Sequence, residues 1–172
     1  MKQFIDVETT GLNRVSDEIM QLTSIITDDN YQVIETHDYK FSTPKVNAEV
    51  LSIQGLTYDE YLQKHCESLE EKAQELYNLF KKTDMVIYAY NQSFDVGMIK
   101  ANFERVGLPI PQLSGQEVMK KRIKLEKNML NRGYDMEEVL AYTRQLFPDT
   151  RGFHDATFDT VCTMLIARDD NL

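Results

Sequence analysis

Three runs rich in β-branched and aromatic residues open the chain and restrict the folds available to it. They span residues 1–7, 18–28 and 31–41. Such runs favour strands, because branched and aromatic side chains pack well on a pleated surface. Asp28-Asp29-Asn30 is typical of a turn and separates the last two runs. This part of the chain therefore predicts three antiparallel strands.

A helix follows the predicted strands. Ser68-Leu69-Glu70-Glu71 matches a capping box, in which the serine hydroxyl and the glutamate carboxylate bond free N–H groups of the first helical turn. Apolar residues then recur with helical period, at Leu69, Ala73, Leu76, Leu79 and Phe80. We expect this helix to pack on the sheet.

The rest of the chain completes an α/β pattern. Residues 85–90 are apolar and bounded, like a buried strand, and residues 94–106 return to helical period before Gly107-Leu108-Pro109. Beyond about Gln116, at most one short strand is expected. The helical stretches there lie near residues 117–128, 136–147 and 155–167. Strands that alternate with helices predict an α/β fold.

The length and the cysteine usage of the chain predict one domain that folds without disulfides. A chain of 172 residues can bury roughly 70% of its unfolded surface. Cys66 and Cys162 lie far apart without a Cys-x-x-Cys or Cys/His tract, so we expect neither a disulfide framework nor a zinc site. A reducing cytoplasm fits this usage. No apolar stretch or leader favours membrane insertion or secretion.

The acidic net charge restricts how this chain could bind a polyanion. There are 19 Lys plus Arg against 28 Asp plus Glu, which gives a net charge of −9. Proteins that hold nucleic acid by bulk charge usually carry a basic face. Bound divalent cations, however, can invert the field at a carboxylate cluster. Whether this chain can bind a polyanion therefore depends on where its acids lie.

The first acids stand at the end of the first predicted strand. Asp6 and Glu8 are two residues apart, and the period of a strand places such residues on one face, where they can grip one cation. Thr9-Thr10-Gly11 follows directly and offers hydroxyls, backbone N–H groups and a flexible turn. These are the groups that a close approach to phosphate requires.

A second group of polar residues follows the strand predicted at 85–90. Asn91 stands at the strand end, and Asp95 lies in the first turn of the next helix, where the helix dipole favours an anion. Phe94, between them, is a core residue by default.

A third group precedes the last predicted helix. His154 lies ahead of its first turn. Ala156 and Asp159 are three residues apart and share a helical face. The small Ala156 side chain would let this face approach another element closely while Asp159 reaches past it.

Each group has an ordinary alternative when taken alone. Asp6 and Glu8 could be solvated acids, Asp95 a helix-stabilising acid and His154 a surface histidine. With each residue type at roughly 6%, one specified pattern with five fixed positions arises by chance on the order of once per million starts. The first group has five such positions and the other two have three each, and the three patterns in order make the joint set of ordinary alternatives untenable.

The three groups resemble the exonuclease motifs of the DEDDh family, the DnaQ-like proofreading exonucleases such as that of DNA polymerase III. The matching motifs are Asp6-Val7-Glu8-Thr9-Thr10-Gly11, Asn91-x-x-Phe94-Asp95 and His154-x-Ala156-x-x-Asp159. Ile53-Gln54-Gly55-Leu56-Thr57 looks like the family's Ile-x-Gly-Ile-Thr segment. The resemblance implies a ribonuclease H-like α/β fold, a five-stranded mixed sheet flanked by helices, in one exonuclease domain over residues 1–172.

The resemblance also implies a mechanism with two divalent cations, Mg²⁺ or Mn²⁺. Two cations about 3.5 to 4 Å apart can serve both the attacking and the leaving oxygen of a phosphodiester. Asp6 would bridge the ions, Glu8 and Asp159 would complete the site that activates water, and Asp95 would help hold the ion near the leaving group. His154 would act as the base, since histidine titrates near neutral pH.

Further residues are candidates for substrate contacts. Leu12 and Ile53 would pack against terminal bases, and Thr10 and Phe94 would hold the final nucleotide, although each could instead belong to the core. The full candidate set is Thr9, Thr10, Gly11, Leu12, Ile53, Thr57, Asn91 and Phe94.

Two positions depart from the usual family pattern. Tyr90 stands where relatives often have His, and Gln116-Glu117-Val118 occupies the region where they often have Asp-Thr. The four acids and His154 are unaffected. The departures concern how the last nucleotide and its sugar are gripped.

Three functions remain open from the sequence. The first is a metal-dependent 3′–5′ exonuclease that acts on single-stranded or frayed DNA and releases nucleoside monophosphates. The second assigns RNA as the substrate, as in oligoribonucleases and RNase T. The third is a binding or assembly subunit of a polymerase, repair or CRISPR adaptation complex. Retention of all five catalytic residue types disfavours a purely structural role.

One lysine-rich stretch is locally basic, although the chain as a whole is acidic. Lys120, Lys124 and Lys127 fall at i, i+4 and i+7, so a helix would align them on one face. This face could contact phosphates upstream of the scissile bond, or it could be an ordinary solvated surface.

Overall fold

The three N-terminal runs form strands, and they pair as predicted. In the computed structural model they are β1 (Lys2–Thr9), β2 (Ile19–Thr27) and β3 (Val33–Lys40). β2 pairs antiparallel with both β1 and β3. The structure describes residues 1–81, 85–109, 113, 115–119 and 122–172.

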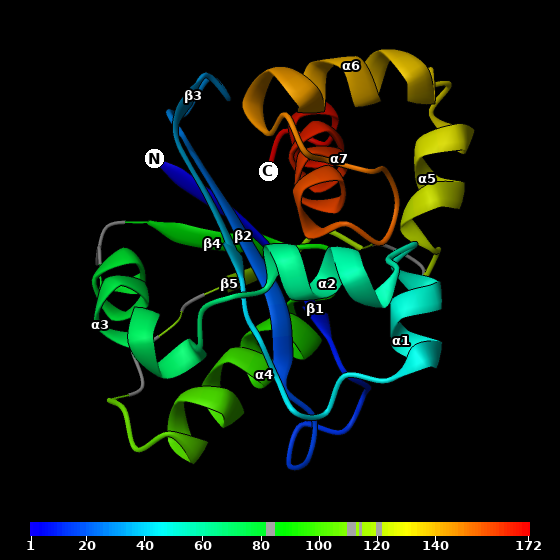
Figure 1. The fold of residues 1–172 in the computed structure, drawn as a ribbon. Helices are drawn as coiled ribbons and strands as arrows, with labels where there is room; N and C mark the ends of the chain where they lie inside the picture. Colours follow the sequence, from blue (N-terminus) through cyan, green and yellow to red (C-terminus); the bar gives the residue numbers. More distant parts are fainter. Residues whose placement is uncertain (82–84, 110–112, 114, 120–121) are drawn as a thin grey trace.

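Two further strands extend the sheet on the other side of β1. β4 (Val86–Ala89) pairs parallel with β1, and β5 (Gly115–Glu117) pairs parallel with β4. The order is β3-β2-β1-β4-β5, a five-stranded mixed sheet with helices on both faces (Figure 1). The predicted α/β architecture is confirmed. β1 lies at the centre and has partners on both edges.

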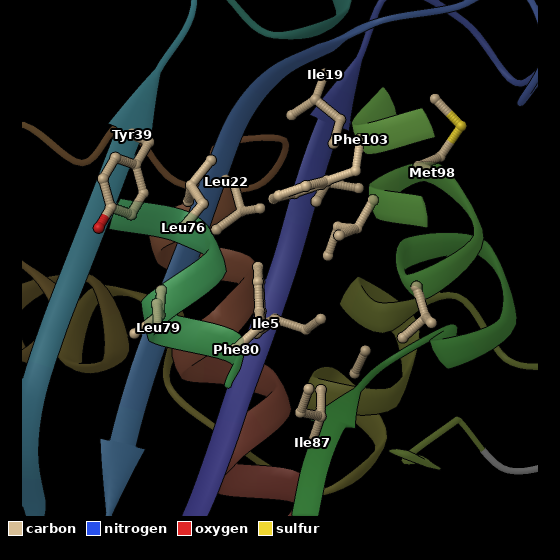
Figure 2. Close-up of a cluster of buried hydrophobic side chains, with 14 of the residues drawn as sticks. Ile5, Ile19, Leu22, Tyr39, Leu76, Leu79, Phe80, Ile87, Met98 and Phe103 are labelled. Atoms are coloured by element: carbon tan, nitrogen blue, oxygen red, sulfur yellow. The ribbon is translucent and has the colours of Figure 1, made fainter. Parts of the chain in front are cut away.

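Helices α3 (Leu69–Phe80) and α4 (Gln92–Arg105) cover one face of the sheet. The predicted capping box is present, because Ser68 and Glu71 bond each other's backbone N–H groups at the start of α3. Figure 2 shows Leu76 of α3 next to Leu22 of β2 and Phe80 of α3 next to Ile5 of β1, all in one buried cluster. The helix predicted after residue 68 therefore packs on the sheet.

The opposite face is covered by α5 (Leu125–Asn131), α6 (Met136–Leu146) and α7 (Ala156–Asp169). α7 runs along this face, and all of its residues from Thr160 to Ala167 are buried. Because side chains alternate along a strand, Phe4 of β1 packs in this second cluster while Ile5 packs against α3 and α4. The face that carries Phe4 also carries Asp6 and Glu8.

Two short helices lie in a segment for which no helix or strand was predicted. They are α1 (Ala48–Ile53) and α2 (Tyr58–Lys64), and they pack around Met20 through buried side chains such as Leu51 and Tyr61. Each is capped by its own side chains, Asn47 for α1 and Thr57 for α2.

The helix predicted near residues 117–128 is wrong at its start. Glu117 belongs to β5, and the helix begins only at Leu125. Val118 and Met119 instead donate hydrogen bonds to the carbonyls of Ala89 and Tyr90, and so continue along β4. Lys120 lies outside the described residues, and Lys124 is the residue that precedes α5. Of the three lysines, only Lys127 lies in a helix within the described residues.

No helix within the described ranges is long and apolar enough to span a lipid bilayer.

The packing of α3 on the sheet can be tested at Leu76, which is completely buried. We expect Leu76→Ala to lower the free energy of unfolding by about 2–5 kcal/mol, since it leaves a cavity against the strands. Gln74→Ala, on the exposed side of the same helix, should change it by only about 0.5 kcal/mol. Urea denaturation measures both values. Equal effects would contradict the packing.

Candidate active site

Three carboxylates from two elements meet at the end of β1. Asp6 and Glu8 project from the face of the strand that α7 covers, and Asp159 lies in the first turn of α7. One carboxylate oxygen from each residue lies within 4.8 Å of the others. Ala156, one helical turn earlier, is fully buried, so its small side chain permits close approach of helix and strand.

A fourth carboxylate, Asp95, arrives from the other side of β1. Asn91 accepts a hydrogen bond from the Phe94 N–H and so caps α4 where β4 ends. This start places Asp95 beside β1, and its Oδ1 accepts a hydrogen bond of 3.2 Å from the Val7 N–H. Since β1 and β4 are parallel, their carboxyl ends meet at one edge of the sheet.

The four acids line a cavity of about 200 Å³. His154 lines the same cavity, as do Asn91 and Phe94. The structure therefore brings together the five residues predicted to be catalytic, which come from three motifs far apart in the sequence. The rest of the wall is formed by Val7, Tyr90 and Leu125, which were not predicted as site residues.

Burial and mutual repulsion make the acids hard to ionise together. Burial, reinforced by Asp155 and Asp95, raises the pKa of Glu8 to about 8. Burial also raises the pKa of Asp95 to about 7, although the Val7 N–H bond opposes the shift. The pKa values of Asp6 and Asp159 lie well above the usual range, mainly through burial and then through the neighbouring carboxylates.

The cluster has the properties of a site for a hard divalent cation. Its donors are carboxylate oxygens, the ligands that Mg²⁺ and Mn²⁺ prefer. Oδ2 of Asp159 accepts a 3.3 Å bond from the His154 N–H, whereas its Oδ1 is buried with no hydrogen-bond partner among the described residues. A buried carboxylate oxygen without a partner is costly, and a bound cation would relieve both this cost and the repulsion.

His154 lies on a short loop in front of α7 and is exposed. Its backbone is in the left-handed region, with φ of 65°. Asp155, the next residue, caps α7 by accepting a hydrogen bond from the Thr157 N–H. This cap explains why the helix begins at Ala156.

A larger cavity of about 410 Å³ adjoins the acids, since Glu8 and Phe94 line both spaces. Leu12 and Ile53 both line it, and 83% and 56% of their respective surfaces are exposed. Exposed apolar side chains beside a carboxylate cluster provide a surface on which a base can pack.

The threonine hydroxyls that were predicted to contact substrate are bonded to other groups of the protein. Thr9, Thr10 and Gly11 all line the larger cavity. The Thr9 hydroxyl, however, donates to the Gly11 carbonyl, and the Thr10 hydroxyl donates to Asp17 and accepts from the Glu18 N–H. Both hydroxyls therefore support the loop after β1.

Thr57 is the one substrate candidate that the structure does not bring into the site. It lines neither cavity. Its hydroxyl accepts a bond from the Glu60 N–H in the capping box of α2. The pattern Thr57-x-x-Glu60 was itself a signal of this helix start.

Four residues in or next to α1 that line the larger cavity were missed. Asn47, Glu49 and Val50 reach it together with Gln54. The available signal was Asn47, an N-cap residue type three positions before Val50. Tyr90 was noted only as a departure from the family pattern. Its hydroxyl donates to the Ile123 carbonyl and accepts from Asn128, which holds the segment before α5 against the site.

Comparison with known proteins identifies the family. A family model for exonucleases, RNase_T, matches residues 4–167, so the chain belongs to this family, and it is of the DnaQ-like 3′–5′ type. The PolC-type DNA polymerase III of Streptococcus pneumoniae (strain D39) is 32% identical over 104 residues, which are 60% of this chain and 7% of the polymerase. That of Staphylococcus haemolyticus is 32% identical over 106 residues, 59% of this chain and 7% of that protein. The chain thus spans a small part of these relatives.

Solved structures confirm the ribonuclease H-like fold. E. coli exonuclease I in complex with a dT13 oligonucleotide has a TM-score of 0.73 at 20% identity, over 98% of this chain and 40% of that one. A product-bound exonuclease I also has a TM-score of 0.73 at 20% identity, over 96% of this chain and 42% of that one.

The raised pKa values predict how stability depends on pH without metal. Carboxyls of an unfolded chain titrate near 4, whereas Glu8 and Asp95 have pKa values of about 8 and 7 in the fold. Between these limits the native state binds more protons than the unfolded state. The free energy of unfolding should therefore fall as pH rises from about 4 to 8.

The same repulsion predicts that Asp159→Asn raises the melting temperature at pH 8 in chelator, by about 2–4 °C per kcal/mol of repulsion removed. Asp149→Asn, at an exposed position, is the control and should have little effect. Thermal unfolding monitored by circular dichroism measures both the pH series and the variants. Stability that rises over this pH range, or a destabilised Asp159→Asn protein, would contradict the account.

Proposed function

We propose that this chain is a metal-dependent exonuclease domain that hydrolyses phosphodiester bonds at the 3′ ends of single-stranded or frayed DNA. The products would be nucleoside monophosphates. The observation that carries the proposal is the convergence of Asp6, Glu8 and Asp159 oxygens within 4.8 Å of one another. Asp95 and His154 line the same cavity.

The adjoining cavities support action at a chain end. The larger space has exposed apolar walls at Leu12 and Ile53, and it meets the acids at Glu8 and Phe94. A terminal base in the larger space would place its phosphate near the carboxylates.

The relatives favour DNA as the substrate. Those compared above are PolC-type DNA polymerase III proteins and an exonuclease I bound to dT13. The likeness to PolC also supports a partner role beside a polymerase. RNA stays an alternative that the assay below separates from DNA.

The four carboxylates would hold two divalent cations, Mg²⁺ or Mn²⁺, through oxygen donors. When bound, such ions lower the pKa of a water molecule and stabilise the leaving oxygen. The Val7 N–H orients Asp95, and the His154 N–H orients Asp159. His154 would accept a proton at its imidazole as the oxygen of the attacking water bonds to phosphorus. The bond from phosphorus to the upstream 3′ oxygen would break, and this oxygen would take up a proton from solvent.

The proposal predicts that Asp6→Asn abolishes digestion of a 5′-labelled oligonucleotide while the domain stays folded. Asp59→Asn, which removes an exposed acid of α2, should digest at the wild-type rate. The assay compares single-stranded DNA, frayed duplex and RNA in Mg²⁺, in Mn²⁺ and in chelator. Shortening from the 3′ end that requires metal is the expected result. Digestion in chelator, or by Asp6→Asn at the wild-type rate, would refute the proposal, and faster digestion of RNA would reassign the substrate.

A further inference from the structure

A fifth acid, Asp155, is almost completely buried next to the proposed metal ligands, with 1% of its surface exposed. Its Oδ1 accepts hydrogen bonds from Gln21 Nε2 at 3.0 Å and from the Thr157 hydroxyl at 2.7 Å. Its Oδ2 accepts a 3.1 Å bond from the Arg151 N–H and lies 3.7 Å from Arg151 Nη2. The carboxylate is thus fully engaged and cannot be a free metal ligand in this arrangement.

The partner of Asp155 is a guanidinium with unused donors. Arg151 is largely buried, and its Nε and Nη1 have no hydrogen-bond partner among the described residues. Its positive charge lies near enough to Glu8 to oppose the rise in the pKa of that carboxyl. Two of its nitrogens are inaccessible to solvent, so the group is poorly placed to receive a phosphate directly.

Arg151 and Asp155 enclose the loop that carries His154. Gly152 and His154 both have positive φ values, 114° and 65°. A non-glycine residue in the left-handed region brings its Cβ close to the following carbonyl oxygen, so this conformation persists only where its surroundings enforce it. The Asp155 N–H donates to the Gly152 carbonyl at 3.1 Å, which closes the loop between the two charged residues.

The loop is also tied to the strand pair that carries Glu8. Gln21 is paired with Glu8 across β1 and β2. Its side chain donates to Asp155 and accepts a 3.2 Å bond from the Ala156 N–H. The His154 loop and the Glu8 carboxylate are therefore held by the same pair of strands.

We propose that Arg151 and Asp155 are positioning residues that fix the His154 loop in its left-handed conformation over the carboxylate cluster. This inference rests on the proposed function for its kinetic consequence. Without the ion pair the loop would occupy other conformations, so the fraction of protein with His154 over the site would fall. Turnover should decrease while oligonucleotide binding stays unchanged.

The test combines Arg151→Gln and His154→Ala, singly and together. His154→Ala should reduce kcat by about 10²–10⁴. Arg151→Gln should reduce kcat by about 10- to 100-fold and leave KM within about twofold, since a small misplacement of a reacting group costs this much. In the His154→Ala background, Arg151→Gln should change kcat by no more than about twofold, because residues that act through one another are not additive.

A second readout does not depend on activity. In the metal-free protein, Arg151→Gln should speed amide hydrogen exchange of residues 151–155 by about tenfold or more, since loss of the ion pair permits local opening. Arg168→Gln is the matched control, because Arg168 is half-exposed and contacts only Asp169 among the described ion pairs. Asp155→Asn removes the same ion pair by changing its acidic partner. If Arg151→Gln does not fold, Asp155→Asn takes its place in every measurement.

Three results would overturn the inference. The first is that Arg151→Gln lowers kcat by the same factor in the wild-type and in the His154→Ala background. The second is a rise in KM. Either result would assign Arg151 a direct contact with substrate. The third is unchanged hydrogen exchange in the loop. A wild-type protein that digests no substrate would instead refute the proposed function, while the exchange experiment would still report on the loop.

Discussion

The repulsion among four carboxylates at the end of β1 is the constraint on which the rest of this structure depends. Burial raises the pKa values of all four acids, and repulsion by neighbouring carboxylates adds to the rise for Asp6, Glu8 and Asp159. A fold that collects such groups loses stability unless a cation or protons neutralise them. The surrounding sheet and helices must therefore supply enough packing to hold the cluster together.

β1 lies at the centre of the sheet, where pairing on both edges and packing on both faces hold the cluster together. The strand has an antiparallel partner, β2, on one edge and a parallel partner, β4, on the other. One of its faces packs on α3 and α4, and the other carries Asp6 and Glu8 toward α7. Asp6 and Glu8 are therefore fixed by the central strand of the sheet, while His154 is supplied by a loop.

Local signals predicted much of this arrangement. Composition located the first three strands, and Ser68 and Glu71 marked α3. Short helices were harder: α1 and α2 have six and seven residues, too few to show a helical period. The helix predicted at residues 117–128 failed because Val118 and Met119 continue pairing with the β4 edge, which depends on a tertiary partner.

At the site, sequence spacing indicated which acids would share a face, but not their distant partners. Thr57 resembles a family position and yet caps α2. The pairing of Asp155 with Gln21 joins residues 134 positions apart, which a single sequence does not reveal. That the assembled residues are catalytic is still a prediction.

The most direct measurement is an anomalous difference map from crystals of the wild-type protein soaked in MnCl₂. The account predicts a strong manganese peak within coordination distance of the Asp6, Glu8 and Asp159 carboxylates, lost in crystals of Asp159→Asn. A fully ordered cluster with no peak at a Mn²⁺ concentration that supports digestion would contradict the claim that these carboxylates form a metal site.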